Sequence, residues 1–295
     1  RHFGGVVDWV AGVRAGWQPV PSVPARGTRH CVITGGADGI GRAIAERYAT
    51  AGYMLTIIDR DSRRAAEVCH GLRARGTTAN AISADLSQAH GIAEVLRRLA
   101  TQPLVDIFVH SAGISAVGAF ATSTLAHQHA VLDVNLGAPL QLTAGVLRMG
   151  MLAPGATIVY LASLSVFTGY PGAAVYAASK AGLAAYARSL RVGLRRQGFN
   201  VLTVFPGPTR TAHARRYSPD NRYESRRMPP DQLAELVAMA IERRAAILIP
   251  GGSNRLMAAL GRLAPQVSEY LMRKMVLDKL QSMALPDDPP GSMHS

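Results

Sequence analysis

The sequence predicts a doubly wound α/β fold, in which helices cover both faces of a seven-stranded parallel sheet. Seven short apolar runs alternate with segments of helical periodicity between residues 29 and 251. Each run is almost continuously apolar, as strands are when a parallel sheet is covered on both faces. The right-handed crossovers between such strands place helices on both sides of the sheet.

The first half of the pattern predicts four strands, at residues 30–34, 54–59, 78–86 and 105–113. The helices that follow them are expected at 40–51, 61–75, 88–101 and 124–151. The second half predicts strands at 156–163, 200–207 and 245–251, with helices over 173–197 and 230–243.

No linker interrupts residues 29–252, so we expect them to form one domain with a lid at about 212–230. Residues 1–28 precede this domain as an N-terminal arm, and residues 253–295 follow it as a C-terminal extension. Apolar residues at helical spacing predict an amphipathic helix in the extension: Leu256, Leu260, Leu263, Val267, Tyr270, Leu271 and Met275. Pro265 should kink this helix or split it in two.

The composition excludes several classes of protein. A chain of 295 residues that is 48% hydrophobic and 17% charged is not intrinsically disordered. Cys31 and Cys69 cannot form a disulfide framework, and no Cys/His cluster suggests a metal site, so we expect no metal and a cytoplasmic location. No apolar run approaches the roughly 18 residues of a membrane span. The net charge is +13, but the arginines are spread along the chain, so no nucleic-acid partner is expected.

A glycine-rich loop, TGGADGIG at 34–41, joins the first predicted strand to the first helix. Such a loop lets the backbone approach a pyrophosphate at the helix N-terminus. Asp59 closes the second strand, where a carboxylate can bind the adenosine ribose hydroxyls and would repel a 2′-phosphate; Asp38 adds negative charge. NAD(H) is therefore favoured over NADP(H). The opposing observation is a set of arginines that could bind a 2′-phosphate: Arg60, Arg63 and Arg64.

Four polar residues predict catalysis of hydride transfer. Tyr176 and Lys180 lie four residues apart on one helix face, and Ser163 ends the fifth strand at the carboxyl edge, where such sheets bind ligands. A tyrosine with a pKa of about 10 needs a nearby cation to act as an acid–base catalyst at neutral pH, which Lys180 can supply. Ser163 can donate a hydrogen bond to the substrate oxygen. Asn135, in the helix before the fifth strand, can hold a water that relays the proton.

These motifs resemble those of the short-chain dehydrogenase/reductase family, in its compact single-domain branch, over about residues 29–251. The family's TGxxxGxG motif matches Thr34, Gly35, Gly39, Ile40 and Gly41, and its tetrad matches Asn135, Ser163, Tyr176 and Lys180. The resemblance implies a Rossmann-like fold and a homodimer or homotetramer. It also implies cofactor contacts from Asp85, Leu86, Ala112, Gly113, Pro206, Gly207, Thr209 and Thr211.

One segment departs from the family pattern. Where the family usually has Asn-Asn-Ala-Gly after the fourth strand, this chain has His110, Ser111, Ala112 and Gly113. The small pair that lets the adenosine approach is kept, but the asparagine contacts at the sheet centre are in doubt. We expect His110 to be a core or strand-end residue rather than a catalyst.

The sequence thus predicts an NAD(P)-dependent oxidoreductase that interconverts a secondary alcohol and a ketone, with a small-molecule substrate that can be lipophilic. An alternative is an NADPH-dependent reductase of 3-oxoacyl thioesters or lipid ketones, favoured by the lid arginines Arg215, Arg216, Arg222, Arg226 and Arg227. An alternative of another class is a dinucleotide-binding regulatory protein without turnover, which the complete tetrad argues against. For the C-terminal extension, subunit packing ranks first and peripheral membrane contact second.

Overall fold

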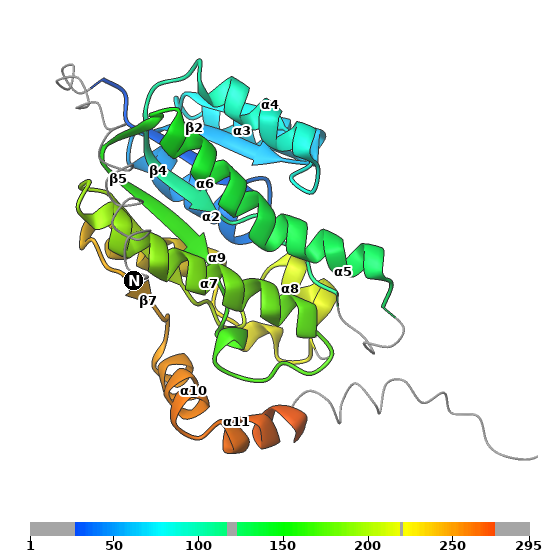
Figure 1. The fold of residues 1–295 in the computed structure, drawn as a ribbon. Coiled ribbons are helices and arrows are strands. Elements are labelled where there is room, and N and C mark those ends of the chain that lie inside the picture. The colour runs from blue at the N-terminus through cyan, green and yellow to red at the C-terminus, as the bar shows by residue number, and fades with distance from the viewer. Residues whose placement is uncertain (1–26, 117–122, 219–220, 275–295) are drawn as a thin grey trace, which may run out of the picture.

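The computed structural model describes residues 27–116, 123–218 and 221–274. Seven strands form one parallel sheet in the order β3-β2-β1-β4-β5-β6-β7. The chain proceeds outward from β1 to β3 and then returns to β4 on the other side of β1, so the direction of winding reverses between β1 and β4 (Figure 1). The doubly wound Rossmann-like sheet is therefore confirmed.

The strands are β1 (His30–Thr34), β2 (Met54–Asp59), β3 (Ala79–Ser83), β4 (Val105–His110), β5 (Leu152–Leu161), β6 (Asn200–Val204) and β7 (Ile247–Leu248). β3, β4, β6 and β7 are shorter than predicted, and β5 begins four residues earlier than its predicted start at 156. The expectation that every strand is buried on both faces is wrong for the two edge strands: Ser83 of β3 is exposed, and Ile247 of β7 is 47% exposed. An edge strand has a neighbour on only one side and less helix above it.

The helices are α2 (Gly39–Thr50), α3 (Ser62–Arg73), α4 (Ala89–Leu99), α5 (Leu125–Leu132), α6 (Ala138–Arg148), α7 (Ala174–Arg195), α8 (Ala212–Tyr217), α9 (Pro230–Glu242), α10 (Gly252–Leu263) and α11 (Pro265–Met272). One core lies under α2, α3 and α9, around Ile44, Leu72 and Val237. A second lies under α4, α6 and α7, around Val95 and Leu142. Each face of the sheet is thus closed by the apolar sides of three helices.

α5 and α6 form one helix, interrupted by a π turn at Asp133–Gly137. The resulting helix, Leu125–Arg148, is the one described helix that is long and apolar enough to cross a membrane, with a mean hydropathy of 1.3 in its most apolar window. The helix meets the length and hydropathy criterion for a membrane span, although the sequence contains no continuous apolar run of that length. Its parts pack against α4 and α7 in the second core, as a core helix of a layered domain does.

The C-terminal helices α10 and α11 lie outside the layered body, beyond β7 (Figure 1). α11 begins at Pro265, so the proline splits the expected helix in two. The predicted apolar stripe points largely outward, since Leu256 and Leu263 are 70% and 86% exposed. The buried residues of these helices are Ala258, Ser268 and Met272. The N-terminal arm up to residue 26 and the extension from Met275 lie outside the described residues.

Candidate active site

The ends of β1 and β4 are joined at the point where the sheet reverses. Thr34 closes β1, and its Oγ1 accepts hydrogen bonds from the amides of Ser111 and Ala112, both at 3.1 Å. Gly35 follows with φ of 64°, and a Cβ there would lie 2.7 Å from Cα of Ala112. Only glycine permits this approach, so the glycine-rich loop rests directly on the segment after β4.

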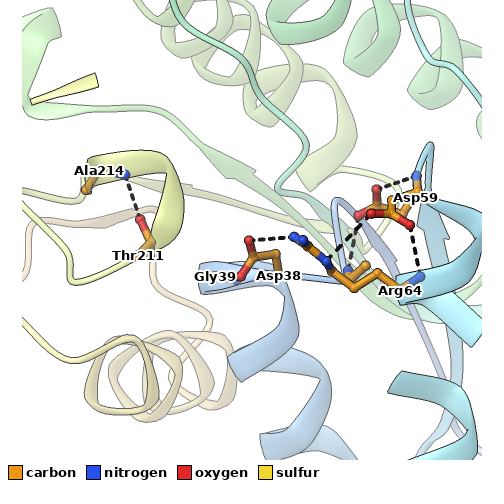
Figure 2. Close-up of polar contacts among 8 residues, drawn as sticks. Asp38, Gly39, Asp59, Arg64, Thr211 and Ala214 are labelled. Carbon is orange, nitrogen blue, oxygen red and sulfur yellow. Dashed lines mark hydrogen bonds and ion pairs between the residues drawn. The ribbon is translucent and has the colours of Figure 1, made fainter. Parts of the chain in front are cut away.

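The glycine-rich loop forms a backbone cradle at the start of α2. Asp38 is the N-cap, and its Oδ1 accepts a hydrogen bond from the amide of Gly39 at 2.7 Å (Figure 2). A Cβ at Gly41 would collide with the carbonyl oxygen of Gly35. The first amides of a helix have no acceptor within it, so those after Gly39 can bind an anion. A side-chain-free cradle at a helix N-terminus fits a pyrophosphate.

Arg64 of α3 lies between two carboxylates at the adenosine end of the predicted site. Its Nη1 is 3.1 Å from Oδ2 of Asp38, and its Nε is 3.6 Å from Oδ2 of Asp61 (Figure 2). Asp59, at the end of β2, accepts hydrogen bonds from the amides of Ala37 at 3.1 Å and Asp61 at 3.1 Å. The structure thus places Asp59 beside the loop, and its contact with a ribose stays a prediction.

A hollow of about 580 Å³ lies beside the ends of β2 and β3. Its polar lining consists of Arg60, Asp61, Ser83, Asp85, His90 and Glu94. Hydrogen bonds from the amide and hydroxyl of Ser87 lower the pKa of Asp85, and Leu86 beside it is buried. None of the lining residues belongs to the predicted tetrad. The hollow is therefore a candidate for the adenosine end of a cofactor site, away from the reacting atoms.

Asn135 lies in the π turn between α5 and α6 and is fully buried. Its Oδ1 accepts a hydrogen bond from the amide of Ile114, and its Nδ2 donates to the carbonyl of Ile114, both at 2.9 Å, and to Oγ of Ser179 at 3.0 Å. A Cβ at Gly113 would lie 3.3 Å from Asn135 Oδ1 and 3.4 Å from Lys180 Nζ. The absence of a side chain at Gly113 thus lets Asn135 and Lys180 lie close to the carboxyl end of β4.

Lys180 and Tyr176 project from one face of α7. Lys180 Nζ donates a hydrogen bond to the carbonyl of Leu161 at 2.8 Å and lies 5.9 Å from the centre of the Tyr176 ring. Burial lowers the pKa of Lys180 to about 8. Ser163 lies two residues beyond β5, as the N-cap of a short 3-10 helix, rather than ending the strand. Ser163, Tyr176 and Lys180 are therefore gathered at the carboxyl ends of β4 and β5.

We expect Lys180 to lower the pKa of Tyr176, but desolvation of the tyrosine is the larger effect in this arrangement. Burial raises the pKa of Tyr176, and its hydrogen bond with Ser163 offsets only part of that effect. The ammonium of Lys180 is directed at the carbonyl of Leu161, 5.9 Å from the ring centre. Tyr176 therefore retains its proton at neutral pH.

The loop after β6 touches the glycine-rich loop. Thr211 is the N-cap of α8, with Oγ1 accepting from the amide of Ala214 at 3.1 Å (Figure 2). A Cβ at Gly39 would lie 3.3 Å from the Thr211 methyl group. Thr209 forms a bridge with Met228 across the lid. The segment carrying Pro206, Gly207, Thr209 and Thr211 is thus brought to the predicted cofactor site.

His213 was not identified from the sequence as a site residue. Its ring lies on α8 with its centre 6.3 Å from that of Tyr176 and 4.7 Å from that of Tyr217. The residue keeps contact with solvent, but desolvation of its ring, followed by the charges of Lys180 and Arg216, lowers the pKa of His213 to about 4. A neutral imidazole thus adjoins Tyr176. The only available signal was its position two residues after Thr211.

His110 belongs to the core, as expected. It is 2% exposed, its Nε2 lies 3.0 Å from Oγ1 of Thr143, and its ring stacks on Tyr160 at 4.9 Å. Its Nδ1 has no hydrogen-bond partner among the described residues. The residue that replaces the family's asparagine therefore packs between the sheet and α6 and does not reach Tyr176.

His110 should make the fold sensitive to acid. Burial lowers the pKa of His110 to about 3, whereas a histidine in the unfolded chain titrates near 6.5. The stability associated with the neutral form is complete above pH ~6.5 and is lost toward pH ~3, by up to about 1.4 kcal/mol per pH unit. Urea denaturation at several pH values should show a shallower acid loss for His110→Asn than for wild type. His70→Asn, at an exposed position of α3, is the control. An equal dependence of stability on pH in the two variants would contradict the proposal that His110 causes the acid sensitivity.

Comparison with known proteins identifies the family of the chain. The model of the short chain dehydrogenase family matches residues 29–222. The chain is 27% identical over 255 residues to the ketoacyl reductase HetN of Nostoc sp., covering 82% of this chain and 87% of that protein. It is 37% identical over 192 residues to the 1-deoxy-11-beta-hydroxypentalenate dehydrogenase of Streptomyces exfoliatus, covering 61% and 67%. A short chain dehydrogenase from Burkholderia cenocepacia, in complex with NADP, matches with a TM-score of 0.69 and 31% identity, covering 77% and 98%.

A doubly wound sheet that carries this loop and these polar groups at its reversal point defines a dinucleotide-dependent oxidoreductase. The chain belongs to the short-chain dehydrogenase family.

Proposed function

We propose that the protein transfers a hydride between a nicotinamide cofactor and a secondary alcohol or ketone, with Tyr176 as the general acid/base. The proposal rests mainly on the convergence of Ser163, Tyr176 and Lys180 beside a loop that fits a pyrophosphate. When bound, the cofactor supplies or accepts the hydride. A substrate oxygen at this site would meet the Tyr176 hydroxyl as proton donor or acceptor and the Ser163 hydroxyl as a second hydrogen-bond donor.

The protonation of Tyr176 favours ketone reduction at neutral pH. Because burial raises the pKa of Tyr176, its hydroxyl holds a proton that it can give to a carbonyl oxygen. Alcohol oxidation needs the deprotonated form, so its rate should rise with pH above neutrality. Both hydrogens of Asn135 Nδ2 are donated, to Ile114 and to Ser179, so a water that carries the proton outward would donate to Oδ1 of Asn135, which also accepts from the amide of Ile114.

The first experiment is a titration with NADH and with NADPH, followed by nicotinamide fluorescence, and then a turnover screen with simple and lipophilic ketones. Binding followed by turnover supports the oxidoreductase proposal. Binding without turnover on any ketone or alcohol would favour the regulatory alternative, and binding of neither cofactor would contradict both.

NAD(H) is the proposed cofactor. Asp59 closes β2, and Arg64 is already paired with the carboxylates of Asp38 and Asp61. Arg63 lies 3.6 Å from Glu67 on its own helix. A 2′-phosphate would therefore meet more carboxylates than unpaired cations in this region. Two observations favour NADP(H) instead: Arg60 lines the hollow beside β2 and β3, and the similar Burkholderia structure contains NADP.

Releasing Arg64 should move the preference toward NADPH. In Asp38→Asn the N-cap of α2 is kept, but the carboxylate that holds Arg64 is lost. We expect NADPH to bind roughly tenfold more tightly, with little change for NADH. Adding Arg64→Met should remove the gain, while adding Arg63→Met, the matched control on α3, should not. A gain that persists without Arg64 would show that the carboxylate acts directly on the cofactor.

A reductase of 3-oxoacyl thioesters is the second candidate, supported by the similarity to a ketoacyl reductase. Two of the lid arginines that suggested an anionic substrate have partners within the lid: Arg215 lies 2.7 Å from Glu224, and Arg226 stacks on Tyr223 at 4.8 Å. Turnover of acetoacetyl-CoA compared with a neutral ketone separates the two candidates.

For assembly and location we propose a homodimer or homotetramer in the cytoplasm, formed through the helices around β4 and β5, as the family resemblance implies. Light scattering of the purified protein measures the number of subunits. Substituting Val192 of α7, which is 76% exposed, with Glu should reduce that number if α7 forms the contact.

A further inference from the structure

We propose that α10 and α11 form a docking surface for an anionic lipid surface. Four large apolar side chains between residues 256 and 270 are exposed: Leu256 (70%), Leu263 (86%), Val267 (49%) and Tyr270 (49%). Leu256 and Leu263 are seven residues apart and so lie on the same side of α10. Apolar groups gathered in this way on a surface mark a contact with a partner or a membrane.

The exposed side chains are not an incompletely packed core. α10 meets the body of the protein through other residues: Gly261 touches the carbonyl oxygen of Phe167, and Asn254 fills the space beside Gly207. Ala258 is the buried residue of α10. α10 is therefore anchored through these residues, and Leu256 and Leu263 remain exposed. The two C-terminal helices lie beyond β7 (Figure 1).

The charges around these apolar groups decide between the occupants. Residues 252–274 contain one acidic residue, Glu269, and four basic ones: Arg255, Arg262, Arg273 and Lys274. Arg255 donates a hydrogen bond to the carbonyl of Ile249, and Arg262 lies over the ring of Phe167, so Arg273 and Lys274 are the cations beside the exposed Tyr270. A second copy placed on the same surface would bring these cations against their own symmetry mates, which is unfavourable. An anionic bilayer offers both an apolar interior and opposite charge. The sequence ranked subunit packing first, and the charges favour the lipid surface.

Tyr270 has the surroundings of an interfacial anchor. The charged groups of Arg273 and Lys274 lie 5.5 Å and 5.0 Å from the centre of its ring. An exposed aromatic ring flanked by cations suits the boundary between lipid chains and headgroups. The net charge of +13 adds a long-range attraction toward such a surface. This surface does not depend on the oxidoreductase reaction, so the two proposals can fail separately.

Sedimentation of the full chain with lipid vesicles tests the surface. We expect binding to vesicles of phosphatidylglycerol and phosphatidylcholine, and at least about tenfold weaker binding to phosphatidylcholine alone. Salt at about 1 M should release the protein, because the screening length falls to about 3 Å. Leu263→Glu with Val267→Glu should lower the bound fraction about tenfold. Leu104→Glu is the control, since Leu104 is a similarly exposed apolar residue (43%) just before β4.

Three outcomes would overturn the proposal. The first is equal binding to neutral and anionic vesicles, and the second is an equal loss of binding in the Leu104→Glu control. The third is an absence of binding, and if the number of subunits then falls in Leu263→Glu, the surface belongs to a second copy of this chain.

Discussion

Replacing Tyr176 with phenylalanine should lower turnover by about 10²- to 10⁴-fold and leave cofactor binding close to wild type. The change removes only the hydroxyl that exchanges a proton with the substrate oxygen, while the half-buried ring on α7 is kept. Turnover is measured under saturating cofactor, and binding by fluorescence titration. Tyr186→Phe, a loss of a hydroxyl on the same helix, is the matched control and should retain activity.

Two results would refute the role of Tyr176. Full activity in Tyr176→Phe would show that another group exchanges the proton, and His213, 6.3 Å away between ring centres, would be the first candidate. A parallel loss of cofactor binding and turnover would instead assign Tyr176 to binding. The pH dependence of turnover separates these cases, since only loss of the acid/base group removes a titration step.

Replacing Lys180 with methionine should abolish turnover and at the same time stabilise the fold by about 1–2 kcal/mol at neutral pH. Burial lowers the pKa of Lys180 from 10.5 to about 8. This shift corresponds to a destabilisation of the charged form by about 3 kcal/mol in the folded state. Loss of the hydrogen bond to the carbonyl of Leu161 reduces the gain in stability by about 1 kcal/mol. Denaturation in urea measures the difference in stability.

The sign of the Lys180 effect depends on pH. The folded pKa is depressed, so the folded state of wild type gains stability as pH rises from about 8 toward 10.5. The advantage of Lys180→Met should therefore be largest below pH ~8 and shrink above it. Arg188→Met, an exposed cation on the same helix, is the control and should change stability by less than about 0.5 kcal/mol. If Lys180→Met is less stable than wild type at neutral pH, the interactions of the buried ammonium outweigh the cost of its desolvation, and the prediction is wrong.

Local patterns were sufficient for the order of the elements and for the position of the motifs. The strands appear along the chain in the predicted order because strands in a sheet covered by helices demand apolar runs. Tyr176 and Lys180 share a face of α7 because a helix places residues four apart together. The C-terminal helix is split before Pro265 because proline has no backbone amide hydrogen to donate within a helix. All of these depend on residues close together in the chain.

The sequence by itself thus determined the class of fold and the motifs of the predicted site, whereas the reversal of the sheet between β1 and β4 was read from the structure. Only the tertiary structure decided that Arg64 lies between Asp38 and Asp61, and that His213 adjoins Tyr176. It also decided that desolvation, which raises the pKa of Tyr176, is the largest influence on that pKa. Ion pairing and desolvation depend on distances between segments that meet only after folding, and no local pattern in the chain encodes those distances.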